Sequence, residues 1–318
     1  MTVLAAAIAE AERRSQASDA DLSGEVNHYR ALLPVICARW RLTVHDWLPG
    51  GVNPPPLAMA TRDGVAAVLT VRTPAALEVP ARVIEAAKGR GYVRALARDS
   101  EVGALLTERL GHDLWSEHPD LASQVRIVVP LLQQAWAVPL EVGGPVEHKA
   151  RGLADVLSEL GERYGGAAPS ARRLARRYAD ELAVGEAADV VCHGDPHAGN
   201  VLRRGEGWAL IDCDGFVSEK AYDLGVLVRD ACGELEAHRL RPGSGSELLQ
   251  NACRTMAEQT GVDAGRIWRW GFIERVTTGL YLAWLGFADE AARMLSSAEV
   301  LAEGALGTPA TTMQRGPI

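Results

Sequence analysis

A short motif in the second half of the chain constrains its fold more than any other feature. Residues 193–200 read His-Gly-Asp-Pro-His-Ala-Gly-Asn, and residues 211–214 follow with Ile-Asp-Cys-Asp. Between them, residues 201–203 and 208–211 have the composition of two short strands, with Arg-Gly-Glu-Gly as the turn that joins them. The segment therefore predicts a loop that leads directly into a tight β-hairpin.

The pairing of this hairpin brings candidate ligands together. When the strands are paired symmetrically about the turn, Asn200 lies opposite Ile211 and beside Asp212. An amide oxygen and a carboxylate at one end of a hairpin suit Mg²⁺ held next to substrate phosphates. Asp195, in the preceding loop, is placed to accept a proton from an attacking hydroxyl. Positioning, charge neutralisation and a weak base are what phosphoryl transfer requires.

This motif resembles the catalytic loop of the aminoglycoside phosphotransferase and choline kinase superfamily, in which His-Gly-Asp is followed by four residues and Asn. The Asp223-Leu224 pair also fits that superfamily. Within it, the chain is most similar to the streptomycin (aminoglycoside 6-) phosphotransferase and hydroxyurea kinase group, which has a His at the position of His197 and a segment similar to residues 216–219 after Ile-Asp. The resemblance extends from about residue 32 to about residue 300 and is loose in the first hundred residues.

The resemblance implies an α+β, two-lobed protein-kinase-like fold, with a small antiparallel-sheet N-lobe and a larger, mostly helical C-lobe. We expect the N-lobe at 1–107, the C-lobe at 108–303 and a disordered tail at 304–318. Hydrophobic periodicity predicts helix in residues 1–45 and 75–87, and strands between 47 and 71, at 93–96 and at 104–106. In the C-lobe it predicts helices near 121–137, 147–164, 170–183, 221–237, 246–260, 263–286 and 288–302.

The other residues around the motif have more than one interpretation. We expect His193 to orient the loop by hydrogen bonding, and Asp223 to bond the backbone of the catalytic loop. His197 lies between base and metal ligand and is a candidate substrate contact, with a buried structural His as the alternative. Asp214 is a second candidate contact to a cationic substrate, with turn capping as the alternative. Glu274 could line the same cleft, although an acid on a helix is usually only solvated.

The N-lobe departs from the family pattern. The family places a Lys on the third strand, paired with a Glu on the next helix, to hold the α- and β-phosphates. Thr70 stands at that position here. Arg72 faces the same way two residues later and is the candidate replacement, with Glu78 or Glu85 as its partner.

Two further segments complete the expected nucleotide site. Residues 108–111 would be the inter-lobe hinge, where Glu108 and Leu110 read the adenine edge through their backbone groups. The phosphate-covering loop at 49–56 is rich in Pro rather than patterned with Gly.

Composition limits the classes of molecule that the protein is expected to bind. A net charge of -8 and a pI near 5.6 argue against nucleic acid. A negative surface favours a cationic small substrate, although it also serves solubility. The 5 Cys show no CxxC spacing, which indicates a reducing cytoplasm. We expect no leader and no membrane-spanning run, and we expect no obligate protein partner.

The leading hypothesis is a phosphotransferase that uses Mg²⁺ and ATP, with GTP as the alternative donor. Its acceptor would be a hydroxyl of a small cationic molecule, with a streptomycin-like aminoglycoside as the first guess and antibiotic resistance as the outcome. The missing Lys keeps a non-catalytic pseudokinase open, and a kinase of another small metabolite is also compatible. A metal-dependent phosphoesterase would need further His ligands, and only His238 follows His197.

Overall fold

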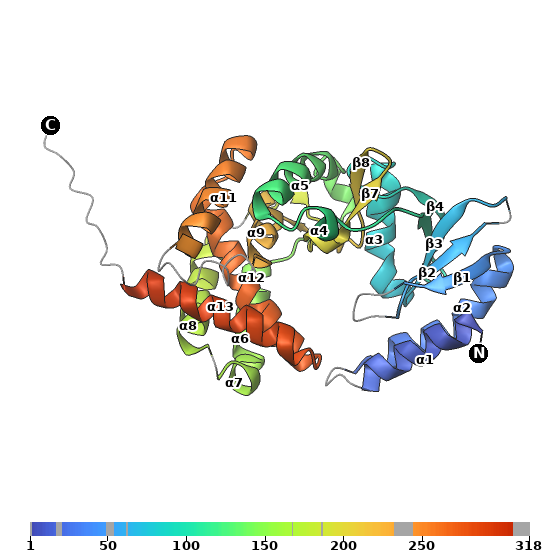
Figure 1. Cartoon of the computed structure of the whole chain (residues 1–318), viewed down its shortest axis with the longest axis horizontal. Helices are drawn as coiled ribbons and strands as arrows, with labels where there is room; N and C mark the ends of the chain where they lie inside the picture. Colours follow the sequence, from blue (N-terminus) through green and yellow to red (C-terminus); the bar gives the residue numbers. More distant parts are fainter. Residues whose placement is uncertain are drawn as a thin grey trace, which may run out of the picture.

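The N-lobe is built on an antiparallel sheet. In the computed structural model, this 5-stranded sheet has the order β1-β2-β3-β5-β4, and helix α3 connects β3 to β4 (Figure 1). The elements are α1 (Val3–Gln16), α2 (Ser23–Arg39), β1 (Thr43–Trp47), β2 (Leu57–Ala60), β3 (Ala66–Val71), α3 (Pro74–Ala87), β4 (Ala95–Asp99) and β5 (Ala104–Glu108). The structure describes residues 2–16, 21–48, 54–61, 63–166, 168–185, 187–231 and 244–307.

Strand β3 lies in the middle of this sheet, between β2 and β5. Its side chains alternate, as expected when one face of a strand is buried. Ala67, Leu69 and Val71 are buried against α1 and α2, whereas Val68 and Thr70 on the opposite face are partly exposed. The expectation that the strand carrying Thr70 belongs to the N-lobe sheet is therefore confirmed.

The C-lobe is mostly helical and carries two small β-ladders (Figure 1). Its helices are α4 (Leu114–Glu117), α5 (Leu121–Ala135), α6 (Lys149–Glu159), α7 (Gly161–Tyr164), α8 (Pro169–Leu182), α9 (Lys220–Arg229), α11 (Ser244–Thr260), α12 (Ala264–Trp284) and α13 (Ala288–Gly307), with 3-10 turns at Leu140–Val142 and Ala198–Asn200. Its ladders pair β6 (Val190–Val191) with β9 (Val217–Ser218), and β7 (Val201–Arg204) with β8 (Gly207–Leu210). Among the described residues, no helix is long and apolar enough to cross a membrane.

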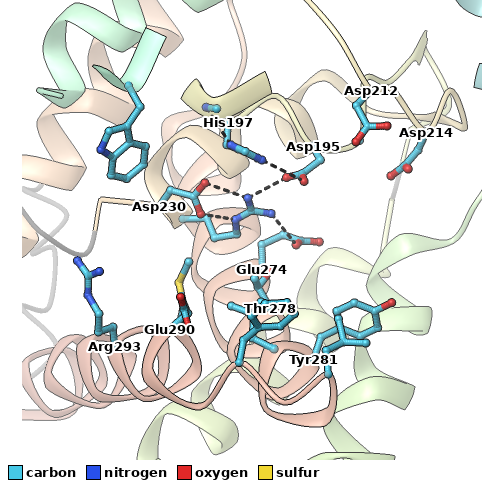
Figure 2. Close-up of a pocket in the computed structure, with 18 of the residues that line it drawn as sticks. Asp195, His197, Asp212, Asp214, Asp230, Glu274, Thr278, Tyr281, Glu290 and Arg293 are labelled. Carbon is cyan, nitrogen blue, oxygen red and sulfur yellow. Dashed lines mark hydrogen bonds and ion pairs between the residues drawn. The ribbon is translucent and has the colours of Figure 1, made fainter. Parts of the chain in front are cut away.

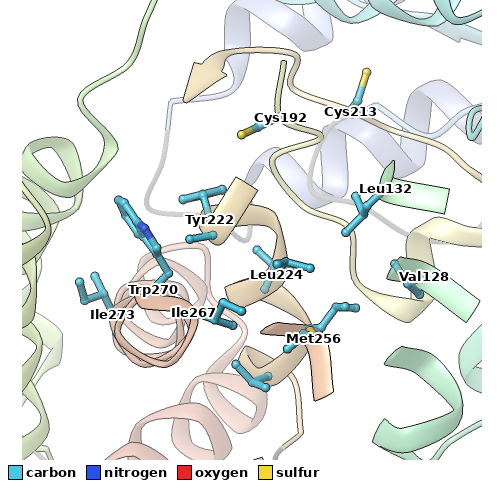
Figure 3. Close-up of a cluster of buried hydrophobic side chains, with 14 of the residues drawn as sticks. Val128, Leu132, Cys192, Cys213, Tyr222, Leu224, Met256, Ile267, Trp270 and Ile273 are labelled. Carbon is cyan, nitrogen blue, oxygen red and sulfur yellow. The ribbon is translucent and has the colours of Figure 1, made fainter. Parts of the chain in front are cut away.

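The core of the C-lobe lies where α9 crosses α12. Two glycines allow the backbones to approach closely: a Cβ at Gly225 would lie 2.7 Å from the amide nitrogen of Gly271. Figure 3 shows the large apolar side chains of this region, with Trp270 and Leu224 among them. This packing buries α9 from Ala221 to Arg229, so the polar residues on α9 have fixed positions.

Several element boundaries differ from the sequence-based expectation. Helix α2 ends at Arg39 and β1 starts at Thr43, because Arg41 adopts a positive φ of 53° that ends the helix. Strand β4 starts at Ala95, since the amide of Val93 instead donates to the carbonyl of Leu210 in the C-lobe hairpin at 2.9 Å.

The helical boundaries of the C-lobe also differ. The helix expected at 147–164 is two helices, α6 and α7. Gly161 begins the second, where a Cβ would lie 2.8 Å from the guanidinium of Arg172. Helix α9 ends at Arg229 rather than near 237, and residues 232–243 lie outside the described part of the chain. Helix α13 continues to Gly307, beyond the expected start of the tail, and residues 308–318 are not described.

Candidate active site

The hairpin has the register that the sequence predicts. Arg203 pairs with Trp208, and the amide of Ile211 donates to the carbonyl of Asn200 at 2.9 Å. Asn200 and Ile211 are therefore opposite each other. Because Asp212 follows Ile211 directly, the amide and the carboxylate emerge at one end of the hairpin.

Asp223 fixes the backbone of the catalytic loop. Its carboxylate accepts hydrogen bonds from the amides of His193 and Gly194, both at 2.9 Å. The indole N–H of Trp136 donates to the same group at 2.8 Å. A fully buried carboxylate with three donors holds the loop far more rigidly than a solvated one would.

His193 is buried beneath the loop in its neutral form. Its Nδ1 accepts from the amide of Asp195 at 3.2 Å, so Nε2 carries the proton and donates to the carbonyl of Ile211 at 2.8 Å. Its ring stacks on Tyr92, with ring centroids 5.7 Å apart. Burial lowers the pKa of His193 to about 4. The side chain thus links the loop to the hairpin and is unsuited to proton transfer near neutral pH.

Asp195 points into a cleft and carries its charge there (Figure 2). Burial alone would raise the pKa of its carboxyl, but Arg229 and His197 together lower it below the ordinary value. The Arg229 guanidinium lies 2.8 Å from Oδ1, and His197 Nε2 lies 3.5 Å from Oδ2. Asp195 is therefore ionised at neutral pH and can accept a hydrogen bond from a substrate hydroxyl.

Asn200 and Asp212 form a donor set that suits Mg²⁺. The Asn200 side-chain NH₂ donates to the carbonyl of Asp195 at 2.9 Å, which leaves its amide oxygen as the free acceptor. Asp212 has a positive φ of 57° and projects into the cleft. Burial and the Asp195 charge raise the pKa of the Asp212 carboxyl. A divalent cation bound by hard oxygen ligands would relieve this repulsion, so the residues fit the metal.

Asp214 adds a third carboxylate on the same side. Its amide donates to the carbonyl of His193 at 2.7 Å, which ties the end of the hairpin back to the loop. Its side chain lies against Gly194, where a Cβ would be 2.4 Å from Oδ2. Burial raises the pKa of Asp214 to about 6, and the neighbouring charges of Asp195 and Asp212 add to it. The position of its carboxylate in the cleft is compatible with a cationic ligand.

The cleft around these residues is large. It has a volume of about 1480 Å³ and extends from α1 across the catalytic loop to α12 and α13. Acidic side chains are frequent in its lining, which includes Glu10, Asp113, Asp195, Asp212, Asp214, Asp230, Glu274 and Glu290. The lining arginines come from both lobes, namely Arg13, Arg14, Arg72, Arg229 and Arg293.

On the N-lobe side, the predicted pairing of Arg72 with Glu78 is wrong. Glu78 instead forms an ion pair with Arg98 on β4, and Arg98 also reaches Glu85 at 3.0 Å. Both candidate glutamates of α3 are thus paired with one arginine of β4. Arg72 itself lines the cleft and lowers the pKa of Asp212 through its charge.

Residues 108–111, the expected inter-lobe hinge, have backbone groups rather than side chains available for hydrogen bonding to a nucleotide base. The Glu108 carboxylate accepts from Arg204 at 2.6 Å and from the amide of Arg94 at 2.8 Å, which joins the two lobes. The amide of Glu108 donates to Arg94 and that of Gly111 donates to Arg203. Within the described residues, the Leu110 amide has no hydrogen-bond acceptor, so it is the free donor of this segment.

His197 and Glu274, two of the expected substrate contacts, differ in how free their side chains are to bind a ligand. His197 lines the cleft with 28% of its side chain exposed, and its Nδ1 accepts from the amide of Gly199 at 3.0 Å. Glu274 also reaches the cleft, but Oε1 accepts from the Tyr222 hydroxyl at 2.6 Å and Oε2 lies 3.9 Å from Arg229. Glu274 therefore lines the cleft, as the sequence suggested, with its carboxylate also engaged within the protein.

Sequence reasoning missed Arg229 and Asp230. Arg229 ends the apolar helix α9, and a charged residue in a buried apolar run needs a partner. That pattern is the only signal in the sequence, and it does not say which partner the arginine meets.

Together, the two-lobed fold and this site define a kinase of small molecules with the protein-kinase-like architecture. The chain matches the family of aminoglycoside/hydroxyurea antibiotic resistance kinases over residues 39–286, and it belongs to that family. It is a phosphotransferase similar to the aminoglycoside O-phosphotransferases, which confirms the resemblance seen in the motif.

Two curated relatives and one solved structure illustrate the match. The chain is 28% identical to a streptomycin 6-kinase of Streptomyces glaucescens, over 76% of this chain and 79% of the relative. It is 32% identical to a hydroxyurea phosphotransferase of Kitasatospora aureofaciens, over 58% of this chain and 56% of the relative. A crystal structure of LicA in complex with AMP has a similar fold, with a TM-score of 0.60, 16% identity and coverage of 86% of this chain and 98% of that one.

Proposed function

We propose that the protein transfers the γ-phosphoryl group of ATP to a hydroxyl of a cationic aminoglycoside of the streptomycin type. The observation that carries the proposal is the position of Asp195, which is ionised and faces the cleft beside Asn200 and Asp212. Family membership supports ATP as the donor, and a structural neighbour binds AMP. Nothing in these similarities supports GTP.

In the proposed reaction, Asp195 orients the acceptor hydroxyl and takes up its proton as the oxygen attacks the γ-phosphorus. The new bond joins the acceptor oxygen to phosphorus, and the bond to the β-phosphate oxygen breaks, releasing ADP. The low pKa of Asp195 makes it a weak base, which suits a loose transition state in which the proton leaves late. Asp195 therefore acts mainly through geometry.

Asn200 and Asp212 would hold Mg²⁺, which when bound neutralises charge on the β- and γ-phosphates. We assign Arg72 to the same phosphates from the N-lobe side, without Glu78 as its partner. The hinge would receive the adenine edge through the Glu108 carbonyl and the Leu110 amide. His193 and Asp223 hold the loop that carries Asp195.

The cleft supports a large cationic acceptor over hydroxyurea. A volume of about 1480 Å³ exceeds what a nucleotide triphosphate tail and a molecule of five heavy atoms would fill. Asp214 lines this cleft beside Asp212, and Glu290 lines it from α13 (Figure 2). A multiply charged, multi-ring amine or guanidine complements such a surface in both size and charge.

A coupled nucleotide-consumption assay tests the proposal. Purified protein with Mg²⁺ and ATP is offered streptomycin, other aminoglycosides, amino-sugars and hydroxyurea, each in parallel with the Asp195→Ala variant. We expect turnover with a streptomycin-like acceptor that the variant lacks, and a product heavier than the acceptor by one phosphoryl group in mass spectrometry. Turnover with hydroxyurea alone would replace the proposed acceptor, and ATP-dependent turnover with no member of the panel would contradict this function.

A further inference from the structure

A buried arginine lies directly behind the proposed base. Arg229 is the last residue of α9, and only 9% of its side chain is exposed, against 39% for Asp195. The close packing of α9 on α12 fixes the backbone from which it projects. Its guanidinium is therefore a fixed charge beside Asp195, whose carboxylate is the more exposed of the two groups.

Asp230 holds this guanidinium in one orientation. Its Oδ1 lies 2.6 Å from Nε of Arg229 and its Oδ2 lies 3.0 Å from Nη2, a bidentate pairing that sets the plane of the group. Oε2 of Glu274 approaches Nη1 from the other side at 3.9 Å. Nη2 also lies 2.8 Å from Oδ1 of Asp195, a close ion pair in which this buried oxygen has no aligned hydrogen-bond donor among the described residues.

The consequence for Asp195 is a fixed rotation of its carboxylate. Oδ1 is buried in the ion pair with Arg229, so Oδ2 is the oxygen that remains for the substrate hydroxyl, 3.5 Å from His197 Nε2. A partly exposed aspartate without such a contact would rotate about its terminal torsion, which has a broad energy profile. In a reaction governed by positioning, this rotation matters, since misplacement by about 1 Å can cost about 10²-fold in rate.

We propose that Arg229 is a positioning residue for phosphoryl transfer, oriented by Asp230 and acting through Asp195. This inference rests on the proposed function, because it concerns the same base. It assigns a role to two residues at the end of α9 that do not belong to the His-Gly-Asp loop or to the metal ligands. Only 9% of the Arg229 side chain is exposed, and the proposed role acts through Asp195, so its removal should change the rate of the bound complex more than substrate affinity.

Steady-state kinetics with ATP and streptomycin test the role. Arg229→Lys keeps the positive charge but loses the planar guanidinium that pairs bidentately with Asp230. For this variant we expect kcat to fall about 10–100-fold and both KM values to change by less than about threefold. For Arg229→Ala, millimolar ethylguanidinium should restore kcat at least about tenfold, whereas ethylammonium should not. A loss that appears in KM, or equal rescue by both cations, would overturn the proposal.

Arg266→Ala is the matched control. Arg266 pairs with Glu219 at the opposite end of α9, with Nη2 and Oε1 2.7 Å apart, and neither residue lines the cleft. This variant also loses an arginine-carboxylate pair, so it should melt at a lower temperature, yet kcat per folded molecule should stay within about threefold of wild type. An equal loss of kcat in both variants would mean that Arg229 is merely structural.

A double-mutant cycle tests whether Arg229 and Asp195 interact, and it needs no acceptor substrate. Unfolding of Arg229→Lys, Asp195→Asn and the double variant is followed in denaturant. We expect the unfolding constants to be non-additive by at least about fivefold, as for charged groups in direct contact. Additive effects would overturn the positioning role. If wild type turns over no member of the panel, the proposed function fails, while the cycle still reports on Arg229 and Asp195.

Discussion

The C-lobe wall of the cleft and its N-lobe wall hold their charged groups in different ways. On the C-lobe side, Asp195 follows directly from amides that bond Asp223, and Asn200 is part of the hairpin ladder. On the N-lobe side, Arg72 leaves the end of β3, and its buried Nε has no hydrogen-bond partner among the described residues. The first set is fixed by backbone geometry and the second depends on one long side chain.

The difference indicates which part of the chemistry tolerates substitution. A base and metal ligands must be placed to a fraction of an ångström, and hydrogen bonds of the loop and hairpin do this. A positive charge near the phosphates can come from several directions, so Thr70 can stand where the family has Lys if Arg72 supplies the charge. We therefore expect large losses from changes on the C-lobe wall and smaller ones on the N-lobe wall.

The largest expected effect is that of Asp195→Ala. Because the side chain faces the cleft and the loop is held through backbone amides, kcat should fall about 10²–10⁴-fold while circular dichroism remains unchanged. The variant is measured with the best acceptor of the panel, alongside its melting curve. Near wild-type turnover would show that another group serves as base, and the contrast between the walls would lose its main support.

Asp212→Asn should cause the next largest loss of activity. Losing one carboxylate ligand removes charge from the proposed Mg²⁺ site, and we expect kcat/KM to fall about 10²–10³-fold. Higher Mg²⁺ concentrations should recover part of the loss, and titration with EDTA should abolish wild-type turnover. An unchanged Mg²⁺ dependence in the variant would remove Asp212 from the metal site.

His193→Gln tests the rigidity of the loop through pH. In the folded protein the pKa of His193 is about 4 against an ordinary 6.5, so folding favours the neutral ring. Its contribution of roughly 3 kcal/mol is complete above pH 6.5, is lost as the pH falls toward 4 and is constant below.

The measurement compares urea unfolding of wild type and His193→Gln between pH 7.5 and pH 4. The side-chain amide of Gln can still donate to the Ile211 carbonyl, so the variant keeps that hydrogen bond without the titration. Asp223, whose pKa burial raises to about 6, is present in both proteins and cancels in the difference. A constant difference across this range would mean that His193 does not titrate as the buried ring should.

The fold and the C-lobe wall were largely readable in the sequence, for a physical reason. Asp195, Asn200 and Asp212 are near one another in the chain, so a tight turn with one register determines their arrangement. The bond from Asp223 to the loop was also anticipated, because the superfamily motif includes it.

Long-range side-chain partners were not readable in the same way. Arg229 meets Asp195 only because α9 packs on α12 through Gly225 and Gly271, a tertiary contact with no local signature. Glu78 was assigned to the wrong arginine for the same reason: sequence spacing puts it on a suitable helix but does not show that Arg98 on β4 lies nearer. Element boundaries at Val93 and Gly161 moved through contacts of that kind.

Arg72→Ala should have a moderate effect confined to the nucleotide. We expect ATP binding to weaken by roughly 1–3 kcal/mol, the range for losing a charge-assisted hydrogen bond to phosphate. Calorimetric titration with a nonhydrolysable ATP analogue and Mg²⁺ measures it, with AMP as the comparison ligand. AMP lacks the distal phosphates and should bind both proteins equally, so a parallel loss of AMP affinity would indicate a damaged fold rather than a lost clamp.

Glu78→Gln should have the smallest effect, and it separates this N-lobe from the family pattern most directly. If Glu78 held Arg72 in place, the variant would weaken ATP binding about as much as Arg72→Ala. The structure instead pairs Glu78 with Arg98, and this arginine lowers the pKa of the partly exposed glutamate. Since Glu85 also contacts Arg98, one neutral substitution leaves the cation with a partner. We therefore expect unchanged affinity for the ATP analogue and a stability change below about 1 kcal/mol. A loss of ATP affinity equal to that of Arg72→Ala would restore the Arg72 and Glu78 pair and remove the contrast between the two walls.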